Sequence, residues 1–187
     1  MTTIVLFHSA QGLRPGVVAF ADRLRAQGHT VHTPDYFDGN VFDELDDGVA
    51  YRDSLGIPEI GRRGLAAVEG LPADVVYAGF SLGTGPAQML TQTRPGALGA
   101  ILMHGCLPTA AFGSPWPAAV PLAIHTMADD PWVDLDVAKA LTGEASGELF
   151  RYPGSGHLFL DEDLPDYDKD AATLVHERVL AFLDRIA

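Results

Sequence analysis

The chain has 187 residues, of which 47% are hydrophobic and 20% charged, a composition typical of globular proteins and unlike that of disordered, collagen-like or coiled-coil chains. With roughly 150 residues per domain as a guide, this length predicts one domain over residues 1–187. The formal net charge of −13 argues against nucleic acid as a partner, because proteins that bind it present a basic face.

The N-terminal residues predict neither a secretion signal nor a membrane anchor. Only four apolar residues in succession precede His8, too few for a signal peptide. No segment approaches the roughly 18 uninterrupted apolar residues of a spanning helix. The single cysteine, Cys106, excludes an intramolecular disulfide. We therefore expect a cytoplasmic protein with no membrane partner.

Short apolar runs alternate along the chain with longer stretches of helical period, which predicts an α/β fold with a mostly parallel sheet between two layers of helices. The expected elements, in chain order, are strand 3–7, helix 13–24, strand 29–32, helix 59–69, strand 74–78, helix 82–93, strand 98–103, strand 120–126, helix 133–141, strand 148–152 and helix 167–186. Residues 34–58 are rich in Asp, Gly and aromatic residues, and we expect a long irregular loop there, a feature that is often functional.

A G-x-S-x-G motif follows the expected strand 74–78, as Gly79-Phe80-Ser81-Leu82-Gly83. Such a motif between a strand and a helix is typical of a nucleophile elbow, in which the serine sits on a tight turn above the sheet edge. The flanking glycines are needed because side chains there would clash with the strand and the helix. The sequence therefore predicts Ser81 as a nucleophile, the alternative being a glycine-rich turn with an incidental serine.

A serine nucleophile needs a histidine base and a carboxylate that orients it, in the chain order Ser, Asp, His on this fold. Asp129 and Asp130 follow the strand 120–126, and either can supply the acid; alternatively both are turn or N-cap residues. His157 lies in a Gly- and Pro-containing loop after the strand 148–152 and fits the base. The alternative for His157 is a solvated loop histidine.

Acyl transfer also needs two hydrogen-bond donors for the negatively charged oxygen of the tetrahedral intermediate. One donor is expected from the backbone N–H of Leu82, directly after the nucleophile. The other is expected from the loop after the first strand, where we assign it to Ala10, with Gln11 as the fallback. These residues act through the main chain, so their side chains give little evidence.

Five segments together resemble the dienelactone hydrolase family, a compact branch of the α/β-hydrolases. They are His8-Ser9-Ala10-Gln11-Gly12, Pro34-Asp35-Tyr36, the elbow, Asp130-Pro131-Trp132-Val133 and Tyr152-Pro153-Gly154-Ser155-Gly156-His157. The resemblance implies that the aspartate before proline, Asp130, is the acid. Dienelactone hydrolases use a cysteine nucleophile and a glutamate in the first loop, where this chain has Ser81 and Ser9. The resemblance thus favours a serine esterase over dienelactone hydrolysis itself.

The expected activity is hydrolysis of a small ester or lactone through a Ser81–His157–Asp130 triad and an acyl-enzyme, in a monomer or homodimer that needs no cofactor. About 17 residues separate Met103 from Val120, too few for a cap domain, which predicts a shallow pocket bounded by loops. Arg52 is a candidate for holding a substrate carboxylate. Candidate pocket walls are Phe37, Phe42, Tyr51, Phe112 and Trp116.

Other chemistries fit the sequence less well. The acidic residues 161–170 do not form a calcium loop, because Ala171 stands where an EF-hand needs glycine. Cys106 is not followed by a helix, which argues against it as a nucleophile, and we expect no metal site. The alternatives to an esterase are a thioesterase or acyltransferase with the same triad, or a non-catalytic ligand-binding protein on a hydrolase scaffold.

Overall fold

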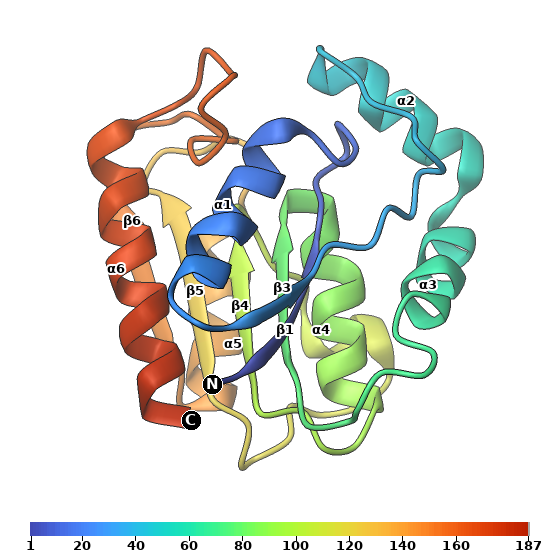
Figure 1. Cartoon of the computed structure of the whole chain (residues 1–187), viewed down its shortest axis with the longest axis vertical. Helices are drawn as coiled ribbons and strands as arrows, with labels where there is room; N and C mark the ends of the chain where they lie inside the picture. Colours follow the sequence, from blue (N-terminus) through green and yellow to red (C-terminus); the bar gives the residue numbers. More distant parts are fainter. Residues whose placement is uncertain (187) are drawn as a thin grey trace.

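The computed structural model describes residues 1–186, which form a six-stranded parallel sheet in the order β2-β1-β3-β4-β5-β6 (Figure 1). The strands are β1 (Thr3–Phe7), β2 (Thr30–His32), β3 (Val76–Phe80), β4 (Gly99–Met103), β5 (Leu122–Met127) and β6 (Glu148–Tyr152). The helices are α1 (Pro15–Ala26), α2 (Leu45–Leu55), α3 (Ile57–Ala66), α4 (Thr84–Thr93), α5 (Leu135–Ala145) and α6 (Lys169–Ile186), with 3₁₀ turns η1 (Ser81–Gly83) and η2 (Thr109–Phe112).

Helices cover both faces of the sheet, because successive side chains of each strand point to opposite faces and both sets are apolar. Ile4 and Leu6 of β1 pack with α1 and α6 in one core. Val5 and Phe7 of the same strand pack with α3, α4 and α5 in the other. The predicted three-layer α/β architecture without a cap is confirmed.

The prediction of an irregular loop over residues 34–58 is wrong in part, because α2 lies inside it. Gly48 is its only buried residue, so the helix has no apolar stripe and gives no helical period in the sequence. Asp46 and Asp47 in its first turn complement the helix dipole. A residue with positive φ, Gly56, separates α2 from α3.

The parallel sheet sets the position of the functional residues. All strands of a parallel sheet end at the same edge, so the segments that follow β1, β3, β5 and β6 meet there. Within residues 1–186, no helix is both long and apolar enough to cross a membrane.

Candidate active site

The turn between β3 and α4 holds Ser81 in a strained backbone conformation. Its φ of 50° lies in the left-handed region, which costs a non-glycine residue about 1 to 2 kcal/mol. A Cβ on Gly79 would lie under 3.0 Å from the Gly83 carbonyl, and one on Gly83 would lie as close to the Phe7 carbonyl. The two glycines of the motif therefore let the chain turn back on itself and against the end of β1.

Three side chains from separate loops form a continuous hydrogen-bonded chain. Ser81 Oγ lies 2.7 Å from His157 Nε2, and His157 Nδ1 lies 2.8 Å from Asp130 Oδ2. The other oxygen of Asp130 accepts the Trp132 N–H at 2.9 Å. His157 and Asp130 are both buried. This is the geometry that a base needs to take a serine proton while a carboxylate fixes its ring.

Of the two candidate acids, the structure brings Asp130 and not Asp129 to the histidine. The side chain of Asp129 is exposed, and its backbone N–H donates to the Gly154 carbonyl at 3.0 Å. That bond ties the segment after β5 to the loop that carries His157. Asp129 thus contributes to the site through its main chain.

Asp166 holds the histidine loop from the other side and was not anticipated from the sequence. Its Oδ2 accepts the backbone N–H of His157 at 2.9 Å and that of Leu158 at 3.4 Å. Nothing in the acidic run 161–170 distinguishes Asp166 from its neighbours, since the contact spans nine residues of irregular loop.

Asp166→Ala is expected to lower kcat about 10-fold with little change in KM, because the His157 ring loses its alignment while the pocket walls are untouched. Asp166→Asn keeps an accepting oxygen and is expected to restore most of the rate. Asp163→Ala, in the same loop and also exposed, is the control and should behave as wild type. Steady-state hydrolysis of p-nitrophenyl esters, the activity expected from the sequence, measures all three; equal kcat for wild type and Asp166→Ala would contradict the positioning role.

The loop after β1 lies beside the elbow, as the close approach of Gly83 to the Phe7 and His8 carbonyls shows. Gln11 donates its backbone N–H to Ser9 Oγ at 3.2 Å. The backbone N–H of Ala10, in contrast, has no hydrogen-bond partner among the described residues. The N–H of Ala10 is therefore not committed to a contact within the described residues, unlike that of Gln11.

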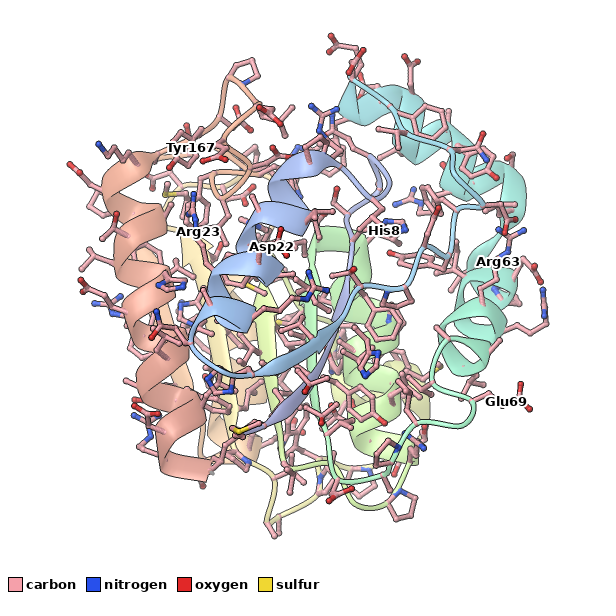
Figure 2. All side chains as sticks on the ribbon, in the orientation of Figure 1. His8, Asp22, Arg23, Arg63, Glu69 and Tyr167 are labelled. Atoms are coloured by element: carbon pink, nitrogen blue, oxygen red, sulfur yellow. The ribbon has the colours of Figure 1, made fainter. Side chains whose placement is uncertain are left out.

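Neighbouring segments fix this loop in place. His8 Nδ1 donates to the Ser9 carbonyl at 2.8 Å, and the His8 ring stacks on Tyr36 at 3.9 Å. Burial lowers the pKa of His8 to about 4, so the ring is neutral at physiological pH. Figure 2 labels His8 together with Arg63, which donates from α3 to the Tyr36 carbonyl. A Cβ on Gly48 of α2 would collide with the Ala10 carbonyl.

A cleft of about 690 Å³ opens beside Ser81 and His157. Its walls come from α3, α4, residues 104–107, η2 and Trp132. The expectation that loops alone bound the pocket is therefore wrong, because two helices form much of the wall. Of the five aromatic residues predicted to line it, the described cleft includes Phe112; the other four pack in or against the core, namely Phe37, Phe42, Tyr51 and Trp116.

At Arg52 and Cys106 the cleft presents an ion-paired guanidinium group and a protonated thiol. Arg52 lines the cleft, but its Nε and Nη2 donate to Asp53 Oδ1 at 2.9 and 2.7 Å. Burial raises the pKa of the Cys106 thiol to about 12, so it is protonated at neutral pH. Among residues 1–186, no cluster of three or more His, Cys, Asp or Glu side chains could hold a metal ion.

The family model described as "Dienelactone hydrolase family" matches residues 1–187. No curated protein sequence matches this chain significantly. Among solved structures, a dienelactone hydrolase-like promiscuous phosphotriesterase from metagenomic libraries has a TM-score of 0.78 at 20% identity, covering 100% of this chain and 87% of that one. Dienelactone hydrolase from Anabaena variabilis has a TM-score of 0.70 at 20% identity, covering 99% and 87%. A phospholipase/carboxylesterase from Dyadobacter fermentans has a TM-score of 0.61 at 18% identity, covering 96% and 90%. At these identities the structural matches show a shared fold.

Proposed function

Because this chain belongs to the dienelactone hydrolase family and is a hydrolase, we propose that it cleaves ester or lactone bonds with Ser81 as nucleophile, His157 as base and Asp130 as the orienting acid. The single observation that carries the proposal is the hydrogen-bonded chain Ser81–His157–Asp130. Dienelactone hydrolases use a cysteine and a loop glutamate, and Ser9 stands at the position of that glutamate, which favours a serine esterase mechanism.

The proposed reaction has two halves. Ser81 Oγ attacks the carbonyl carbon while His157 Nε2 takes its proton, and the resulting oxyanion accepts hydrogen bonds from the backbone N–H groups of Leu82 and Ala10. His157 then delivers the proton to the leaving alcohol as the C–O bond breaks, which leaves an acyl-enzyme. Water repeats the sequence on that ester and releases the acid. Asp130 keeps Nδ1 protonated and stabilises the transient imidazolium.

The test is intact-protein mass spectrometry after exposure to a fluorophosphonate, which reacts with activated serines. Wild type is expected to gain one adduct and Ser81→Ala none, because the serine hydroxyl alone is a weak nucleophile and His157 activates only this one. A panel of esters and lactones then compares turnover. Folded wild-type protein without an adduct would contradict the proposal and favour a ligand-binding protein on the same scaffold.

A further inference from the structure

Exposed apolar side chains gather around one feature, the cleft beside Ser81. Four of the eight large apolar residues that the structure describes as exposed, Ile57, Leu65, Leu107 and Trp132, line it. The first two lie on α3, Leu107 lies in the segment after β4, and Trp132 lies in the segment after β5. Apolar surface concentrated in a cleft is characteristic of a site that binds an apolar ligand.

The polar groups of the cleft leave no free charge for a ligand. Arg62, like Arg52, lines the cleft and is already paired, with Glu59 at 2.6 and 2.7 Å. The protonated thiol of Cys106 adds no charge. A carboxylate in this cleft would have to compete with a protein carboxylate for each arginine. The composition therefore favours an uncharged ligand.

The part of the cleft that α3 and α4 line lies on the acyl side of the nucleophile. His157 reaches Ser81 from the loop after β6, and it must contact the leaving oxygen in order to protonate it. The α3 wall stands across the molecule from β5 and β6, and Gly64 packs it against Pro86 of α4 (Figure 1). The leaving group thus departs toward His157 and Trp132, while the group on the other side of the carbonyl extends along α3 and α4.

We propose that the part of this cleft lined by α3 and α4 binds the uncharged, apolar acyl chain of the substrate, and that the preferred esters carry roughly six to ten acyl carbons, in keeping with a cleft large enough for a drug-sized ligand. The inference rests on the proposed ester hydrolysis and adds the substrate class. It differs from the small esters expected from the sequence.

Two glycines on facing helices keep the cleft open. A Cβ on Gly61 of α3 would meet the Met89 sulfur at 3.6 Å, and one on Gly85 of α4 would meet only Leu107 Cδ1 at 4.0 Å. Neither glycine has a positive φ, so a larger side chain can be introduced there without backbone strain. Gly143 is exposed on α5, and a Cβ there would have nothing within 4 Å, so it offers a matched control away from the cleft.

The first test compares kcat/KM for p-nitrophenyl acetate, butyrate, hexanoate and octanoate. Each methylene that becomes buried is expected to raise kcat/KM about fourfold, so octanoate, with four more methylenes, should exceed butyrate by roughly 200-fold. Gly85→Leu should reduce the octanoate-to-acetate ratio at least about tenfold, and Gly143→Leu should leave it unchanged. A flat profile, or equal ratios for wild type and Gly85→Leu, would overturn the inference.

The second test varies the alcohol and needs no change to the protein. Octyl acetate and ethyl acetate carry the same acyl group, so the proposal expects a much smaller gain from the longer alcohol than from the longer acid. A larger gain from the alcohol would overturn the acyl assignment of the cleft.

A binding measurement separates this inference from the proposed function. Methyl octanoate and methyl butyrate are titrated into Ser81→Ala, with the heat of binding as the readout. Methyl octanoate is expected to bind at least about 50-fold more tightly than methyl butyrate. Adding Gly85→Leu to Ser81→Ala is expected to weaken the binding of methyl octanoate. Binding with this preference supports the site even if wild type forms no fluorophosphonate adduct. An adduct without the preference would leave the proposed function standing and overturn the acyl site.

Discussion

Ser81→Ala is expected to lower kcat for ester hydrolysis by about 10⁴- to 10⁶-fold, because the covalent step loses its only activated nucleophile while the donors at Leu82 and Ala10 still stabilise some direct attack by water. The measurement is steady-state hydrolysis of p-nitrophenyl esters, with protein purified apart from wild type to exclude carry-over. Turnover within about tenfold of wild type would contradict Ser81 as the nucleophile.

Ser81→Gly supplies the matching stability measurement. Glycine adopts the positive φ of this position without strain, so the free energy of unfolding should rise by roughly 1 kcal/mol relative to Ser81→Ala. Both variants should be inactive. If the turn were unstrained, urea denaturation would give Ser81→Gly and Ser81→Ala the same free energy of unfolding. If either variant lost its folded structure, its loss of activity could not be assigned to catalysis.

Asp130→Asn is expected to lower kcat by about 10⁴-fold at neutral pH. An amide can present its N–H₂ to His157 Nδ1 and so favour the tautomer that leaves Nε2 protonated and unable to accept the Ser81 proton. It also removes the charge that stabilises the imidazolium. Hydrolysis rates and unfolding curves, measured together, distinguish this effect from a loss of structure.

Asp129→Asn is the matched control, since the two carboxyl groups are neighbours in sequence and only one contacts His157. The exposed Asp129 side chain should tolerate the change with a rate close to that of wild type. The opposite ranking, with Asp129→Asn the more damaged enzyme, would overturn the assignment of the acid.

The sheet and the sequence positions of the triad could be predicted because they depend on local signals. Gly79 and Gly83 mark the elbow since no other residue fits against the neighbouring carbonyls. Central strands such as β3 and β4 are apolar throughout, as burial on both faces requires. The order Ser81, Asp130, His157 follows from the succession of strands that end at one edge.

Other parts of the site depend on contacts between distant segments and leave no local pattern. Asp166 looks like any residue of an acidic run until the folded loop brings it to the His157 N–H. In the sequence, Gly48 looks only like a glycine that weakens a helix. In the structure, its missing Cβ lets α2 lie close to the Ala10 carbonyl. The cleft is shaped by how α3 lies against α4, and the expectation of loop walls failed because helix orientation is set by packing.

The spacing of the triad along the chain has a consequence for protein synthesis. His157 is added to the growing chain 76 residues after Ser81, and the loop that carries it is flanked by β6 and α6, the last strand and the last helix described. In the proposed mechanism Ser81 therefore has no base until the loop after β6 has been synthesised and has docked beside the elbow. The proposed activity thus requires the C-terminal third of the chain, although the nucleophile lies well before it.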